Sequence, residues 1–148
     1  MTYVLDTNIL LHILRKSDFF NKLNLKYNFF HPSNNVYVSI VSVGEIYSLA
    51  FRNRWGDTRR QELAHWLQRF QTIPLYEEVA FIDVYAEIDN FSQNHHPTLK
   101  LPTSARKMGK NDLWIATTTA YFNATLLSTD NDFAHLNNVF FYFDKIDV

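Results

Sequence analysis

Short apolar segments rich in β-favouring residues alternate along this chain with longer segments of helical periodicity. The apolar segments are Thr2–Leu5, Val36–Val41, Ile73–Leu75, Thr125–Leu127 and Val139–Phe143. The helical segments are 8–15, 17–27, 42–53, one that starts at 57 or 58, 77–93 and 111–122. Because a helix that joins two strands favours their parallel pairing, this order predicts an α/β fold. We expect a mostly parallel five-stranded sheet with helices on both faces.

Three local signals make this expectation more specific. Ser42 followed by Glu45 fits a capping box, so we expect a helix to begin at Ser42. Asn111 is expected to cap the helix that follows it. Pro74 lacks a backbone N–H, which favours an edge position for the strand at 73–75.

Composition limits the class of protein. A chain of 148 residues, 47% of them hydrophobic, can bury a core, and we expect one domain over residues 1–148. The absence of Cys excludes a disulfide scaffold, thiol catalysis, zinc fingers and iron–sulfur ligation. No apolar run approaches the roughly 20 residues of a membrane span, and the first residues, Met1 to Asp6, do not resemble a signal peptide. We therefore expect a soluble, cytoplasmic protein.

Acidic residues stand where the strands end. Asp6 ends the first strand, Glu45 follows the second, Asp130 and Asp132 follow the fourth, and Asp112 opens the helix before the fourth. Ligands of open parallel sheets bind beyond the carboxyl ends of the strands, so these acids can converge on one edge. Converging carboxylates repel one another unless a cation neutralises them. Oxygen ligands without Cys point to Mg²⁺ or Mn²⁺.

Each of these acids also has a purely structural interpretation. Asp6 can be an N-cap, and Glu45 can be only the capping-box partner of Ser42. Asp112 can be a first-turn acid that the helix dipole favours. The Asp130–Asp132 segment can be an Asx turn.

Basic residues fall into two groups, although the net charge is −1 and gives no general attraction to nucleic acid. Residues 90–111 contain no acid. Their four basic residues are Lys100, Arg106, Lys107 and Lys110. The second group, diluted by Asp57 and Glu62, contains Arg52, Arg54, Arg59, Arg60 and Arg69. Either group can also be an ordinary solvated surface.

Several catalytic and binding motifs are excluded by single residues. A P-loop ending at Gly109-Lys110 would need Gly at Ser104 and Ser or Thr at Asn111. An EF-hand loop starting at Asp130 would need Gly at His135 and Glu at Phe141.

Four segments carry a family resemblance. They are Leu5-Asp6-Thr7-Asn8, Ser39-Ile40-Val41-Ser42-Val43-Gly44-Glu45-Ile46, Asn111-Asp112-Leu113-Trp114-Ile115-Ala116 and Leu127-Ser128-Thr129-Asp130-Asn131-Asp132-Phe133. In these residues and in their order, the chain resembles the PIN-domain ribonucleases, and most closely the toxin of VapBC toxin–antitoxin systems. The resemblance spans nearly the whole chain and implies a three-layer α/β/α PIN-like domain.

The resemblance also implies an activity and a site. It implies Mg²⁺ or Mn²⁺ in an acidic pocket, an endoribonuclease that acts on single-stranded RNA, a homodimer, and a small antitoxin partner. The family's acidic positions fall on Asp6, Glu45, Asp112 and Asp130, with Asp132 as an accessory metal ligand. The positions that support them fall on Asn8, Ser42 and Ser128, where Ser128 replaces the usual Thr.

Further expectations concern the surfaces around this site. Arg106, Lys107 and Lys110 are expected to hold RNA phosphates. Segments 21–35 and 95–110 look longer than in compact members, which can alter RNA choice or the antitoxin groove. We place that groove near four aromatic residues, which can equally be core: Phe19, Phe20, Trp55 and Trp66.

Three different functions also remain open at this point. A phosphatase of the haloacid dehalogenase kind would use Asp6 as nucleophile, but it wants Asp where this chain has Asn8. The chain can also be a non-catalytic PIN scaffold, or a PIN nuclease of RNA processing without an antitoxin. The sequence leaves open whether one or two metal ions act, and which RNA is cut.

Overall fold

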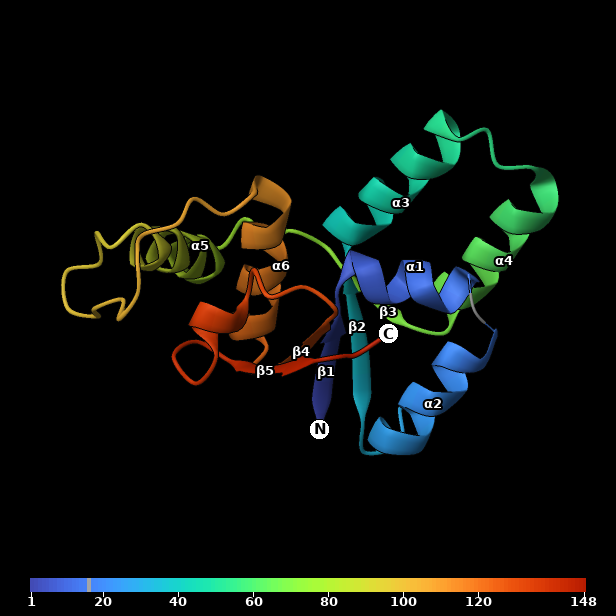
Figure 1. Cartoon of the computed structure of the whole chain (residues 1–148), viewed down its shortest axis with the longest axis horizontal. Helices are drawn as coiled ribbons and strands as arrows, with labels where there is room; N and C mark the ends of the chain where they lie inside the picture. The colour runs from blue at the N-terminus through green and yellow to red at the C-terminus, as the bar shows by residue number, and fades with distance from the viewer. Residues whose placement is uncertain (16) are drawn as a thin grey trace.

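The computed structural model describes residues 1–15 and 17–148 (Figure 1). Its strands are β1 (Thr2–Leu5), β2 (Asn35–Ser39), β3 (Gln71–Ile73), β4 (Thr125–Ser128) and β5 (Tyr142–Lys145). Its helices are α1 (Thr7–Arg15), α2 (Ser17–Tyr27), α3 (Ile40–Arg52), α4 (Asp57–Gln68), α5 (Val79–Ser92), α6 (Lys110–Tyr121) and the short 3₁₀ helix η1 (Ala134–Leu136). Within the described ranges no helix is long and apolar enough to cross a membrane.

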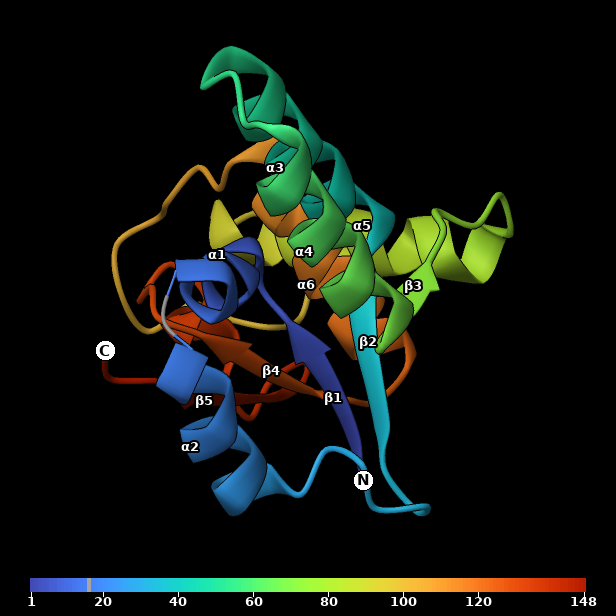
Figure 2. The ribbon, with the colours of Figure 1, turned by 90° about the vertical axis from the view of Figure 1, so that its right-hand side faces the viewer.

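The strands form one sheet in the order β3-β2-β1-β4-β5, and every described pair is parallel. The predicted parallel sheet is therefore confirmed, and β3 lies at an edge as expected. The order reverses between β1 and β4, because the chain leaves β1 toward β2 and β3 and then crosses back to β4 (Figure 2). Such a reversal opens a crevice beyond the carboxyl ends of the two central strands.

Two hydrophobic cores lie on opposite faces of the sheet. Alternate residues of β1 divide between them: Tyr3 and Leu5 face one core and Val4 faces the other. Helices α1 to α4 pack on the first face, and α5, α6 and η1 pack on the second (Figure 1). This arrangement confirms the three-layer α/β/α fold.

The start of α3 differs from the prediction. Strand β2 ends at Ser39, and the Ser39 hydroxyl accepts a hydrogen bond from the Val41 N–H at 3.3 Å, so Ser39 is the N-cap. Ser42 is buried within the first turn. The capping box of Ser42 and Glu45 is therefore wrong, because a second serine three residues earlier competes for the role and the strand leads directly into it.

Three other predicted boundaries also move. Gly109, not Asn111, is the N-cap of α6, and its carbonyl accepts the Leu113 N–H at 3.0 Å. Strand β3 is Gln71–Ile73 rather than 73–75. Strand β5 is Tyr142–Lys145 rather than 139–143, since residues 137–141 form a turn in which Asn138 has φ 61°. Pairing with β4, not apolar character, selects the residues of β5.

Candidate active site

Asp6 lies directly after β1, at the point where the strand order reverses between β1 and β4. Its side chain is 3% exposed, and the Asp6 N–H donates to the Leu127 carbonyl of β4 at 3.0 Å. The Ser128 hydroxyl donates to Oδ2 of Asp6 at 2.6 Å, and the Thr7 N–H donates to Oδ1 at 2.7 Å. Both carboxylate oxygens are thus held in position, Oδ2 by the last residue of β4 and Oδ1 by the first residue of α1.

Burial dominates the ionisation of Asp6. Desolvation raises its pKa to about 6, against the two hydrogen bonds, which lower it, and repulsion from Glu45 and Asp130 raises it further. Its backbone carbonyl accepts the Ile9 and Leu10 N–H groups, so Asp6 does begin α1. That capping role does not account for the burial of a carboxylate facing other acids.

Asp112 faces the same crevice from the first turn of α6. Burial raises its pKa to about 6, and repulsion from Asp6, Glu45, Asp132 and Asp130 adds to the increase. Since repulsion of this kind acts only over short distances, the structure brings the five predicted acids to one edge of the sheet. Gly109 lies tight against this group, because a Cβ there would stand 3.3 Å from Oδ2 of Asp112.

Glu45 and Asp112 lie on facing walls of a cleft of about 820 Å³ between α3 and the start of α6. Glu45 is half-buried in the second turn of α3. Because Ser39 and not Ser42 caps α3, Glu45 is not the capping-box partner of Ser42. Its carboxylate is instead directed to the cleft that Asp112 lines.

Asp130 and Asp132 form the outer part of the site, and both are exposed. The Asp130 N–H donates to the Ser128 hydroxyl at 3.0 Å, so Ser128 links Asp130 to Asp6. The Asp132 N–H donates to Oδ1 of Asp130 at 3.2 Å, which is the Asx turn that the sequence allows. That turn occupies one oxygen of Asp130 and leaves the rest of both carboxylates open.

The donor set fits a hard divalent cation in its chemistry, since it offers only carboxylate and hydroxyl oxygens whose mutual repulsion a cation relieves. The arrangement is open, however. Among residues 1–15 and 17–148, no three Asp, Glu or His side chains stand close enough together to form a ready metal-binding group.

The three predicted support residues differ in their contacts. Ser128 is buried, and its hydroxyl holds Asp6. Ser42 is buried, and within the described chain its hydroxyl has no hydrogen-bond partner. Asn8 is half-buried beside Thr7, and its side chain makes no hydrogen bond to the described residues. Only Ser128 therefore has an observed contact with an acid of the site.

The predicted basic residues line the rim of the crevice. Arg106 and Lys107 lie beside Asp112 and Asp132 around a second hollow of about 250 Å³, and Lys110 lines the larger cleft. Arg106 donates through a guanidinium nitrogen to the Asp132 carbonyl at 3.3 Å and through its backbone N–H to the Ser92 carbonyl at 2.8 Å.

A buried contact that the sequence did not reveal anchors this basic segment. The Ser92 hydroxyl lies 2.7 Å from Nε2 of His135 and 3.3 Å from the Met108 sulfur. Burial and the nearby Arg106 lower the pKa of His135 to about 4, so the ring is neutral at pH 7. The contact joins residues 43 positions apart, so no local sequence pattern could predict it.

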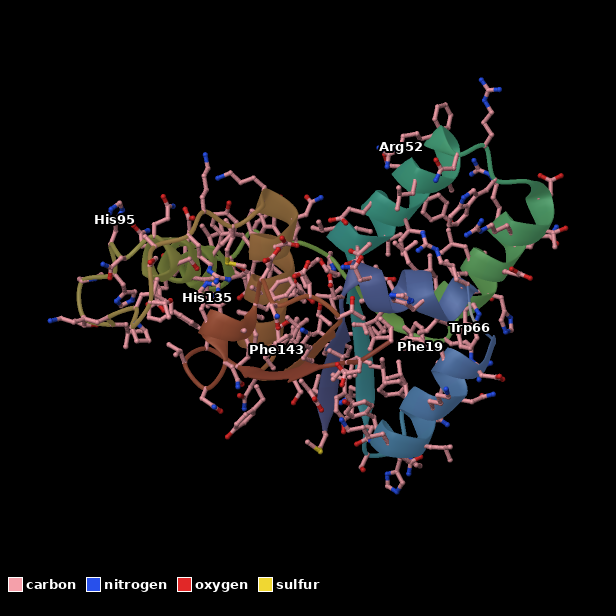
Figure 3. The ribbon with its side chains drawn as sticks, in the orientation of Figure 1. Phe19, Arg52, Trp66, His95, His135 and Phe143 are labelled. Carbon is pink, nitrogen blue, oxygen red and sulfur yellow. The ribbon has the colours of Figure 1, made fainter. Side chains whose placement is uncertain are left out.

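The aromatic residues proposed for an antitoxin groove belong to the core instead. Phe19, Phe20 and Trp55 are buried. Trp66, labelled in Figure 3, packs on Phe20 at 4.5 Å between ring centroids. A groove lined by these side chains is therefore wrong, because Phe19, Phe20 and Trp55 pack into the core on this face of the sheet and Trp66 is partly buried against it.

Comparison with known proteins gives one family and several solved structures. The profile of the PIN domain matches residues 3–139. VapBC2 from Rickettsia felis, bound to a DNA fragment from its promoter, has a similar chain at TM-score 0.76 and 21% identity, covering 99% of this chain and 100% of that one. VapBC-1 from nontypeable Haemophilus influenzae follows at 0.73 and 19%, covering 98% of each chain.

VapBC-5 from Mycobacterium tuberculosis, described as a member of the VapBC family of toxin–antitoxin systems, is similar at TM-score 0.60 and 18% identity, covering 99% of this chain and 98% of that one. At these identities the likeness concerns the fold. A comparison with curated proteins returns no significant match.

Proposed function

The chain belongs to the PIN domain family, and on that premise we propose that it is a metal-dependent endoribonuclease and the toxin of a VapBC-type pair. One observation carries the proposal. Asp6 follows β1 at the switch point of the sheet, Asp112 in the first turn of α6 lies near enough to be repelled by it, and burial and neighbouring acids raise the pKa of each to about 6. Such perturbed carboxylates in a crevice are typical of a site where chemistry occurs.

Asp6, Glu45 and Asp112 would hold Mg²⁺ or Mn²⁺, with Asp130 and Asp132 beside them. When bound, such an ion supplies a water of lowered pKa and offsets charge on the phosphate undergoing attack. Ser128 and the Thr7 N–H orient Asp6, so its oxygens need little rearrangement. With a pKa of about 6, Asp6 and Asp112 are mostly ionised at neutral pH and ready to act as ligands.

Water, not the 2′-hydroxyl of RNA, is the nucleophile in this proposal. The bond between phosphorus and the 3′ oxygen breaks, so the products carry a 5′-phosphate and a 3′-hydroxyl. Arg106 and Lys107 border the hollow next to Asp112 and would hold a flanking phosphate.

The test is incubation of the purified chain with single-stranded RNA in Mn²⁺, in Mg²⁺ and in EDTA. We expect cleavage only with metal, and ends that a 5′-phosphate-dependent exonuclease degrades. Ends carrying a 2′,3′-cyclic phosphate would exclude water as the nucleophile. A folded protein that cleaves no RNA under any of these conditions would instead be a non-catalytic PIN scaffold.

The antitoxin proposal rests on family membership and on the toxin–antitoxin complexes among the similar folds. We expect the product of the adjacent gene, a small protein, to co-purify with the tagged chain and to suppress its RNA cleavage. A helix of that protein would dock on an apolar surface, with a basic side chain entering the acidic crevice. If the neighbouring product neither binds nor inhibits, the chain is a PIN nuclease without an antitoxin.

The homodimer is likewise a proposal. It is supported by an apolar stripe on α3 formed by Ile40, Tyr47 and Phe51, which are 42%, 45% and 81% exposed. These residues are seven and four positions apart and so share one face of the helix. Light scattering of the purified protein should give a mass of two chains, and Phe51→Lys should reduce it to one.

A further inference from the structure

One wall of the large cleft is a single face of α3. Glu45, Ser48 and Arg52 line it, and they are three and four residues apart, which places them one above another along the helix. At 1.5 Å of rise per residue, Arg52 lies about 10 Å along the helix axis from Glu45. Figure 3 shows Arg52 at the end of α3 remote from the sheet. The cleft therefore leads from the acidic site toward a cation.

The opposite wall is the start of α6. Gly109, Lys110, Asn111 and Asp112 line it. The carboxylates of Glu45 and Asp112 thus occupy one part of the cleft, and it also presents the cations Arg52 and Lys110. Gly44 adds no side chain, and a Cβ at that position would meet nothing within 4 Å, so the cleft is open there.

Among the described residues, three arginines of the same basic group have partners and Arg52 has none. Arg59 stacks over Trp55 at 3.9 Å, and Arg60 donates to the Trp55 carbonyl at 3.1 Å. Arg69 lies over Phe30 at 4.5 Å. Within the described part of the chain, Arg52 makes no hydrogen bond and no ion pair, and it is exposed to solvent.

We propose that Arg52, with Lys110 across the cleft, forms a phosphate-binding subsite that holds the RNA backbone beside the scissile phosphate. The inference rests on the proposed function and adds a second anchoring point to it. Arg106 and Lys107 border the smaller hollow, which shares Gly109 and Asp112 with the large cleft. A strand laid across Gly109 would then meet cations on both sides of the acids.

A phosphodiester strand suits this layout better than a peptide does. Arg52 lies about 10 Å along the axis of α3 from Glu45, and its guanidinium matches phosphate oxygens in a two-point contact. Arg52 also stands in the last turn of α3, where a positive charge favours the helix. Because that interaction affects the stability of the protein, the test of the subsite must measure RNA binding.

The experiment measures binding of a short fluorescein-labelled single-stranded RNA by anisotropy, in EDTA, over a range of salt. We expect Arg52→Gln to weaken binding about five- to tenfold and to reduce the slope of log affinity against log salt by about 0.7, the contribution of one phosphate contact on a single strand. Arg52→Lys keeps the charge and should recover part of the loss.

Arg54→Gln is the matched control. Arg54 is exposed on the turn after α3 and does not line the cleft, so its loss should change binding less than twofold. An equal loss from Arg52→Gln and Arg54→Gln would mean general attraction and would overturn the subsite.

A second measurement locates the contact. Replacing single phosphates of the RNA by neutral methylphosphonates should weaken binding to the wild type at one flanking position. Arg52→Gln should be insensitive at that same position. If the wild type cleaves RNA but both proteins respond alike at every position, the subsite is wrong and the nuclease stands. If the wild type neither binds RNA in EDTA nor cleaves it in Mn²⁺, both proposals fall. If Arg52→Gln weakens binding of the antitoxin and leaves RNA binding unchanged, the cleft is a protein-binding surface.

Discussion

Asp6→Asn is expected to lower the rate of RNA cleavage by about 100-fold or more. Asp6 is the most buried acid of the site, and both of its oxygens are positioned by hydrogen bonds. Replacing one oxygen by an amide removes the charge that a cation needs, and even residues that only orient a ligand contribute about 10- to 100-fold. Single-turnover cleavage of the same RNA in Mn²⁺ measures the effect.

The fold should survive this substitution. The amide of Asn keeps an oxygen for one donor and offers its NH₂ to the Ser128 oxygen, so circular dichroism and the melting temperature should show a folded protein. Asp83→Asn is the control, because Asp83 is exposed on α5 away from the crevice, and it should cleave like the wild type. Full cleavage by a folded Asp6→Asn protein would contradict the assignment of the site.

Asp112→Asn is expected to stabilise the protein in EDTA by about 1 kcal/mol at neutral pH. Burial and repulsion from four acids raise the pKa of Asp112 from 3.8 to about 6, so its ionised form is disfavoured in the fold. We expect the stability gained by removing this charge to exceed the stability lost with its favourable helix-dipole interaction in the first turn of α6. Water screens this half-buried group, which limits the gain to about that size.

The dependence on pH follows from the direction of the shift. Between pH 3.8 and about 6, folded Asp6 and Asp112 keep protons that the unfolded chain has released. The free energy of unfolding of the wild type in EDTA should therefore fall as pH rises through this range and stay low at pH 7. Below about pH 4 the advantage of Asp112→Asn should disappear, because the carboxyl is protonated in both states.

Mn²⁺ should reverse the order of stability. At about 100 times the dissociation constant, binding adds roughly 2.7 kcal/mol to the wild type, and Asp112→Asn should gain clearly less. Thermal melting of both proteins in EDTA and in Mn²⁺ measures this. If Asp112→Asn is less stable in EDTA and gains as much from Mn²⁺ as the wild type, Asp112 is only a first-turn acid and the shared metal site is wrong.

Local sequence signals predicted the elements well where no neighbouring signal competed with them. The apolar run at Thr2–Leu5 forms β1, and the edge strand β3 ends at Ile73, directly before Pro74. The starts of α3 and α6 were misplaced because alternative caps stand within a few residues of each other, two serines at α3 and a Gly two residues before an Asn at α6. The choice between them depends on where the preceding strand stops pairing or the loop packs, which is a tertiary property.

The alternation of strands and helices follows from the sequence alone, and so does the placement of Asp6, Glu45, Asp112 and Asp130 at one edge of the sheet. Both follow from local periodicity and from the order of the elements along the chain, so neither needs coordinates. Which side chains meet depends instead on the packed fold. The Ser128 contact to Asp6 spans 122 residues, and Arg52 shares the cleft with Lys110 across 58 positions (110 − 52). Packing also buried Phe19, Phe20 and Trp55 rather than leaving them as a groove, because the face of a helix that covers a sheet is chosen by the fold as a whole.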